Sequence, residues 1–187
     1  MLGQTFFTIF HHSFVPLFHY FQDAAMQPPD AGELRKLAEE LISQQTTMTI
    51  STAHENAPWA APVYYANRKS RFYFFSDPSS RHIREALESG RAAAAIFHQA
   101  STWKEIRGIQ MSGSISHVLP GLNAIRATRA YLRKFPFTRD FFEPSLQIDL
   151  EAFINKFHVR LYVFLPTLLY YQDNRIRFSF REKITLE

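Results

Sequence analysis

The feature of this sequence that most restricts its fold is a succession of short segments with β-strand character, each followed at once by turn-forming residues. The clearest pair is "WAAPVYYA" (59–66) and "RFYFFS" (71–76), which the polar tetrapeptide "NRKS" joins. So short a link allows a hairpin between antiparallel strands but not the long crossover that parallel strands require. Further strands are expected at residues 46–53, 92–97, 106–118 and 158–165, with a last pair, "LLYY" and "RIRFSF", around the turn "QDNR".

Three amphipathic segments predict helices beside these strands, at residues 33–45, 80–89 and 119–135. In the last of them, Leu122 and Ile125 are expected to face inward, and Lys134 is expected to face outward with the arginines. Strands that follow one another hairpin by hairpin, with helices packed outside, indicate a mainly β fold, an antiparallel, Greek-key-like barrel with peripheral helices.

Two strands carry residues that limit their place in such a sheet. Pro62 lies inside strand 59–66, so that strand should be at an edge or a bulge, or should offer its backbone to something other than a neighbouring strand. The strand is also too rich in apolar residues to have one face in water. The strand at 92–97 is expected to be buried, and the two glycines of strand 106–118 are expected to mark bends.

Composition excludes several classes of function. The chain has no cysteine, which rules out disulfides, cysteine-based zinc sites and thiol nucleophiles and is compatible with the cytoplasm. The net charge of +4 comes from basic residues scattered among acidic ones. We therefore expect no nucleic acid partner, and we interpret the basic face of helix 119–135 as a solvated surface. We also expect no membrane partner and no metal site.

Residues 1–25 differ from the rest of the chain. They are aromatic and lack Lys and Arg, and two histidines and a proline interrupt the apolar run that a secretory signal or a membrane span would need. Met26 begins "MQPPDAGELRKLAEEL", which is typical of an ordinary cytoplasmic amino terminus. We expect residues 1–25 to be an extension, disordered or produced by a mis-set start codon, and residues 26–187 to form a single domain.

The segment "SDPSSRHIREALESG" (76–90) gathers hydroxyls and cations where a strand ends and a helix begins. Cations are unfavourable there because the amino end of a helix already carries partial positive charge, whereas a bound anion reverses that effect. Free backbone N–H groups, hydroxyls, a guanidinium and an imidazole together suit a phosphate. The alternative is that Asp77 alone offsets Arg81 and that Ser79 or Ser80 only caps the helix.

Part of this segment, "FYFFSDPSSRH", resembles the phosphate-binding segment of the pyridoxamine 5'-phosphate oxidase-like superfamily, an aromatic strand ending in Thr or Ser, a short turn, then Ser-Arg-Lys. Here His82 replaces the Lys. Within that superfamily the chain is similar to a small uncharacterised bacterial family (UPF0306-like), in which "SRH" or "TRH", "RGIQMSG" and "AYLRKFPFTR" recur in this order. The likeness covers approximately residues 34–165.

The resemblance implies a split β-barrel that binds FMN at the interface of a homodimer. It implies that the phosphate contacts the serine, arginine and histidine side chains of the segment and that the isoalloxazine ring lies against the backbone of residues 60–64. Lys104 and Gln110 would reach the ring or phosphate, with Trp103 as an aromatic wall, although Trp103 as a core residue and Lys104 as a solvated residue stay open. The cofactor residues expected are Ala61, Pro62, Val63, Tyr64, Ser76, Ser80, Arg81, His82, Lys104 and Gln110.

The chain also departs from true pyridoxamine phosphate oxidases. Those enzymes carry Arg and Lys on the strand that corresponds to "WAAPVYYA" and a basic carboxy-terminal motif, and neither is present here. We therefore expect a flavin-dependent oxidoreductase of another, unnamed substrate rather than an enzyme of vitamin B6 oxidation. No catalytic residue is assigned, because His98 and His117 are candidates by type only and a core role is expected for both. A non-catalytic flavin-binding or stress-related protein and a haem-handling protein are the alternatives.

Overall fold

The computed structural model describes residues 28–141, 154 and 157–186. The expectations for residues 1–25 and for Met26 lie outside these ranges. The helices and strands are α1 (Ala31–Gln44), β1 (Thr47–His54), β2 (Ala57–Tyr64), β3 (Ala66–Arg68), β4 (Arg71–Ser76), α2 (Arg81–Ser89), β5 (Ala92–Phe97), η2 (Trp103–Glu105), β6 (Arg107–His117), α3 (Leu122–Lys134), η3 (Pro136–Phe141), β7 (Arg160–Asp173) and β8 (Arg181–Lys183).

The strands of the described chain form one antiparallel sheet in the order β2-β1-β5-β6-β7-β4-β3, with β8 paired to β7. Its two end strands, β2 and β3, are separated in the chain by Tyr65 alone. The chain therefore passes from one edge of the sheet to the other at this residue and curls the sheet into a split barrel. The predicted antiparallel barrel is confirmed, but the strand expected at 59–66 is two strands that break at Tyr65.

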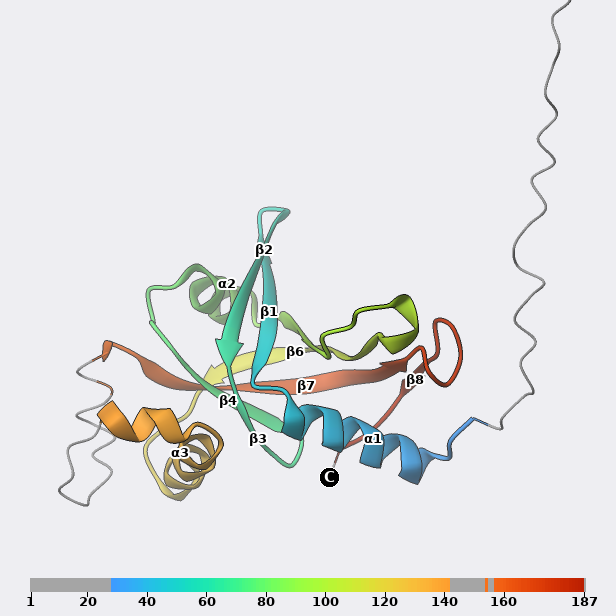
Figure 1. The fold of residues 1–187 in the computed structure, drawn as a ribbon. Coiled ribbons are helices and arrows are strands. Elements are labelled where there is room, and N and C mark those ends of the chain that lie inside the picture. The colour runs from blue at the N-terminus through green and yellow to red at the C-terminus, as the bar shows by residue number, and fades with distance from the viewer. Residues whose placement is uncertain (1–27, 142–153, 155–156, 187) are drawn as a thin grey trace, which may run out of the picture.

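Alternating side chains of these strands fill the interior of the barrel. The cross-strand register aligns Ile50 with Ala61 and Ala94, and Ala94 with Met111, so that one inward row runs across four strands. α1 and α2 lie on opposite sides of β7 in Figure 1 and close the core from both sides. They add Leu34, Ala38, Leu41, Ile42, Ile83 and Ala86 to the same buried cluster.

Of the two glycines expected to mark bends in strand 106–118, Gly113 lies at an irregularity, whereas Gly108 lies in regular pairing with β5 and β7. The register between β6 and β7 shifts between Ser112 and Gly113, which is where one extra residue enters β7. A Cβ atom on Gly113 would lie 2.1 Å from the carbonyl oxygen of Leu165, so only glycine fits this close approach of two strands. β7 itself is longer than expected, and "RIRFSF" forms the turn before β8 rather than a strand.

Helix α3 covers the outer face of β3, β4 and β7. Leu132 and Phe135, which the sequence pattern also predicts to face inward, are buried, but the expectation is wrong for the amino-terminal half of the helix. Leu122 and Ile125 are 70% and 46% exposed, whereas Ala124 and Ala127 are buried against β4 and β7. Bulky side chains on those strands already fill the space, so the helix contacts them through its smallest residues. Lys134 is half-buried rather than outward, because its Nζ atom donates to the carbonyl of Ile42.

The outer side of β2, β1 and β5 is a second face of the sheet, and its side chains are mainly small and at least partly exposed. We call it the outer sheet face, and it comprises Thr49, Ser51, Ala60, Pro62, Ala93, Ala95 and Phe97. Strand β2 is therefore largely in water and β5 is buried on one side only, contrary to the expectation for both. Among the described residues no helix is long and apolar enough to cross a bilayer.

Candidate functional site

The amino end of α2 lacks the side-chain cap that the start of α1 has, and the start of α3, at Gly121, lacks one too. In α1, Asp30 and Glu33 bond each other's backbone N–H groups in a capping box, at 2.9 and 3.1 Å. In α2 the residue at the cap position is Ser80, as predicted, but its hydroxyl donates to the carbonyl of Asp77 at 2.7 Å and makes no cap bond. No acidic residue lies in the first turn of α2. An anion is therefore the natural partner for its first N–H groups.

A cluster of polar side chains lies directly beside this helix start. The Ser76 hydroxyl is 2.9 Å from Nε2 of His82 and 3.2 Å from the hydroxyl of Ser80. Ser76 and His82 are each only 8% exposed. Burial lowers the pKa of His82, and the negative charge of Glu85 opposes this only in part. The structure thus brings together three of the four residues that were expected to hold a phosphate.

The fourth residue, Arg81, is turned away from this cluster. Its Nε atom donates to Oε1 of Glu85 at 2.6 Å, its Nη2 atom donates to the carbonyl of Ala57 at 3.3 Å, and its guanidinium lies 4.8 Å from the centre of the Trp59 ring. Glu85 is buried and also accepts a bond from Thr52, and these two donors lower the pKa of its carboxyl. Arg81 therefore fastens α2 to β1 and β2.

Asp77, the alternative partner expected for Arg81, is engaged elsewhere. Its Oδ1 atom accepts from the backbone N–H and the hydroxyl of Ser79, both at 2.7 Å, and this lowers its pKa. The partner that sequence reasoning missed is Glu85. The signal was present, because Arg81 and Glu85 are four residues apart on one helix, the spacing at which side chains of opposite charge meet.

The expected residues of β2 point to both sides of the strand. Ala61 and Val63 face inward opposite Ile50 and Met48, whereas Pro62 and Tyr64 face outward. Since β2 pairs only with β1, Pro62 lies on an edge strand, as predicted.

The remaining two expected residues lie apart from the serine and histidine cluster. Gln110 is bonded to Gln172 at 3.0 Å and to Arg181 at 3.2 Å, on the outward side of β6. Lys104 lies 5.6 Å from the ring of Trp103, which packs against Phe178 in the turn before β8. Trp103 is 44% exposed and is therefore not a core residue.

Neither histidine that was considered as a catalytic candidate is a core residue. His117 is exposed, with its ring 4.7 Å from that of Tyr162. His98 is partly exposed and pairs through its backbone with Arg107. Within the described ranges no three His, Cys, Asp or Glu side chains converge in a way that could hold a metal ion.

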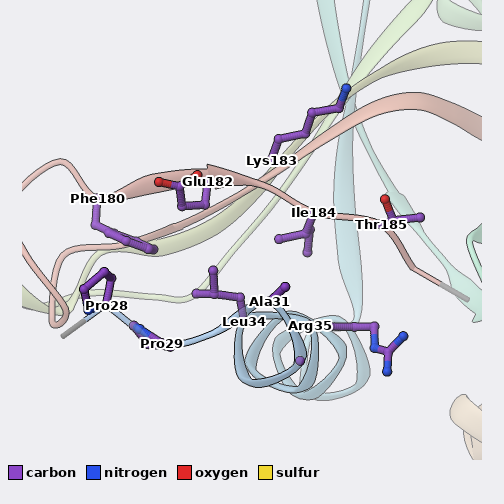
Figure 2. A pocket seen from close by; sticks show the side chains of 11 residues that line it. Pro28, Pro29, Ala31, Leu34, Arg35, Phe180, Glu182, Lys183, Ile184 and Thr185 are labelled. Carbon is purple, nitrogen blue, oxygen red and sulfur yellow. The ribbon is translucent and has the colours of Figure 1, made fainter.

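A cavity of about 570 Å³ lies elsewhere, between α1 and the segment that contains β8 (Figure 2). Leu34 and Arg35 line it on the helix side, and Phe180, Lys183 and Ile184 line it on the strand side. None of the residues expected to bind the cofactor is among its lining residues.

The buried position of His82 predicts a specific dependence of stability on pH. Its folded pKa lies below the ordinary 6.5, so as the pH falls below 6.5 the unfolded chain takes up a proton first and folding loses stability. A His82→Gln variant should lose less stability than the unmodified protein between about pH 7.5 and pH 5.5, measured by urea unfolding. The carboxyl groups of Asp77 and Glu85 change the stability only at lower pH, because their ordinary pKa values are 3.8 and 4.5 and folding lowers both. If the free energies of unfolding of the two proteins change equally over this pH range, His82 is not buried as a neutral side chain.

Comparison with known proteins identifies the family to which this chain belongs. The family model described as pyridoxamine 5'-phosphate oxidase matches residues 34–135, more than half of the chain. A UPF0306 protein of Citrobacter koseri is 31% identical over 112 residues, which make up 59% of this chain and 76% of that protein.

Solved structures share the fold at low sequence identity. A heme binding protein from Mycobacterium smegmatis superposes with a TM-score of 0.61 at 15% identity, over 86% of this chain and 60% of that one. A FAD-binding protein from Mesorhizobium loti superposes with a TM-score of 0.55 at 13% identity, over 76% of this chain and 94% of that one. On the family match and on this shared fold, the chain belongs to the pyridoxamine 5'-phosphate oxidase family, with the UPF0306 proteins among its relatives.

Proposed function

We propose that this protein binds FMN and that the phosphate of FMN lies at the amino end of α2. The observation that carries the proposal is that this helix has no side-chain cap and no acid in its first turn, while two buried polar side chains, Ser76 and His82, lie beside it. A phosphate supplies the acceptors that the first N–H groups need, and its charge favours the protonated form of His82. The solved FAD-binding relative supports a flavin on this fold.

The isoalloxazine ring then lies along β2, beyond the phosphate site. Strand β2 is an edge strand, so the backbone groups on its free side are available to a ligand. Pro62 offers no N–H group, which suits a strand position where no second strand pairs. Bound there, FMN supplies hydride transfer, and the chain supplies its position and its electrostatic surroundings.

The reaction we propose is that of a flavin-dependent oxidoreductase, in the cytoplasm, whose substrate is not pyridoxamine phosphate. The sequence of β2, "APWAAPVY", has no cation to grip a substrate phosphate. Arg81, whose guanidinium lies over Trp59 of that strand, is paired with Glu85.

We propose further that the protein is a homodimer assembled through the outer sheet face. This face carries an apolar edge strand and the 63% exposed side chain of Phe97, with only small side chains between them. A flat surface of small and aromatic side chains is suited to close contact with a second copy. In such a dimer the second copy would also lie beside the unpaired edge of β2, and hence beside the flavin ring.

A serine substitution tests the phosphate site. Ser76→Ala should weaken FMN binding by about 10-fold or more, because a hydrogen bond to a charged group is lost. Ser79→Ala is the matched control, since its hydroxyl lies in the same turn but bonds Asp77, and it should leave the dissociation constant of FMN nearly unchanged. Titration followed by flavin fluorescence measures both. Equal losses in the two variants would contradict the site.

The absorbance spectrum of the purified protein separates the flavin proposal from a haem protein, which the heme binding relative makes the second candidate. We expect flavin bands near one FMN per chain after expression with riboflavin, and bleaching of these bands by NADH or NADPH. A Soret band without flavin would favour haem. Flavin bands that neither reductant bleaches would favour a non-catalytic flavin-binding protein.

An aspartate on the outer sheet face tests the dimer. The unmodified protein should show twice the 21.8 kDa mass of the chain by light scattering, and Phe97→Asp should show the mass of one chain, because a carboxylate cannot be buried unpaired. Leu122→Asp is the matched control, because Leu122 is 70% exposed on α3, over a different face of the sheet. A monomeric unmodified protein, or dissociation by both variants, would contradict the interface.

A further inference from the structure

The pairing of Arg81 with Glu85 turns the guanidinium that the sequence predicted for the Ser76 and His82 cluster away from it. The pairing of strands in the sheet brings a different arginine, Arg160, to the Ser76 and His82 cluster. β4 pairs with β7, and the register of this pair puts Ser76 directly opposite Arg160, the first residue of β7.

These two residues share the inner side of the sheet. Phe74 and Tyr162, the preceding inward pair, stack at 5.8 Å in the barrel interior, and Ser76 and Arg160 follow them by two residues on each strand. Residues directly opposite in an antiparallel pair have Cβ atoms about 4.5–5.5 Å apart. Arg160 therefore reaches the end of the barrel at which α2 starts.

Arg160 is exposed, and within the described part of the chain it has no ion-pair partner. It differs in this from Arg81, whose charge is matched by a carboxylate at 2.6 Å. A guanidinium beside a serine, a histidine and an uncapped helix start has the geometry of an anion contact.

A buried hydroxyl two residues from Arg160 on β7 is a second observation that points to a ligand at this end of the barrel. Tyr162 is fully buried, and its hydroxyl has no hydrogen-bond partner in the described chain. Burial raises its pKa, and the charges of Arg160 and Asp77 act on that pKa in opposite directions. Buried hydroxyls are normally hydrogen-bonded, so an acceptor is expected here.

We propose that Arg160, rather than Arg81, is the guanidinium that holds the ligand's phosphate, and that the Tyr162 hydroxyl is a further donor to it. The inference rests on the proposed phosphate site and adds to it two residues from a strand far along the chain. Arg81 then has a positioning role, since it fastens α2 to β1 and β2.

The test compares two arginine variants with two probes on the full chain. Arg160→Gln should weaken FMN binding by about 10- to 100-fold, and should abolish the rise in melting temperature that inorganic phosphate causes. Arg81→Gln should retain the phosphate effect, although its melting temperature without ligand should fall. Arg71→Gln is the control for loss of charge, because Arg71 is exposed at the other end of β4. Circular dichroism checks that each variant is folded.

The outcomes separate this inference from the flavin proposal. If the unmodified protein binds phosphate through Arg160 but does not bind FMN, the inference stands and the flavin proposal fails. If FMN and phosphate bind Arg160→Gln as well as they bind the unmodified protein, Arg160 is not the contact and the inference is overturned. Loss of the phosphate effect in Arg81→Gln alone, or no phosphate effect in the unmodified protein, would overturn it too.

Discussion

The passage of the chain through Tyr65 is the constraint on which the rest of this structure depends. This fully buried residue joins the two end strands of the sheet; its N–H donates to Thr46, and its hydroxyl donates to the carbonyl of Ile42 at 2.6 Å. The Nζ atom of Lys134 donates to the same carbonyl and lies 3.9 Å from the centre of the Tyr65 ring, with burial lowering its pKa to about 8. One carbonyl near the end of α1 thus ties the strand switch to both α1 and α3.

Closure of the sheet is also what assembles the candidate site. Because β4 lies between β3 and β7, the end of β4 is held against the beginning of β7, and Ser76 meets Arg160 there. α2 follows Ser76 almost at once, and the bonds of Arg81 to Ala57 and of Thr52 to Glu85 hold it against β2 and β1. In the site that we propose, the two arginines have different roles: Arg81 fixes the helix, and Arg160 contacts the phosphate.

The sequence predicted what depends on local pattern. The hairpin of β1 and β2, the edge position of Pro62 and the end of β4 followed by the start of α2 are all set by neighbouring residues, and the structure has each of them. The hairpins expected around "NRKS" and "QDNR" differ, because β4 pairs with β3 and β7 rather than with β2, and residues 175–180 form no strand. It could not predict which residues from distant segments meet. The register of β4 with β7, the small-residue face that α3 presents and the separation of Lys104 and Gln110 from Ser76 are set by tertiary packing. The exposure of β2 likewise depends on its place at the edge, which its apolar composition does not reveal.

Comparison of FMN with riboflavin shows whether the end of β4 and the start of α2 form a site for a phosphate group, as we propose. The two ligands differ only in the phosphate, so the ratio of their dissociation constants for the unmodified protein isolates what that group contributes. We expect FMN to bind at least about 100-fold more tightly, because several charge-assisted hydrogen bonds are made to the phosphate alone. Equal affinity for the two flavins would contradict it.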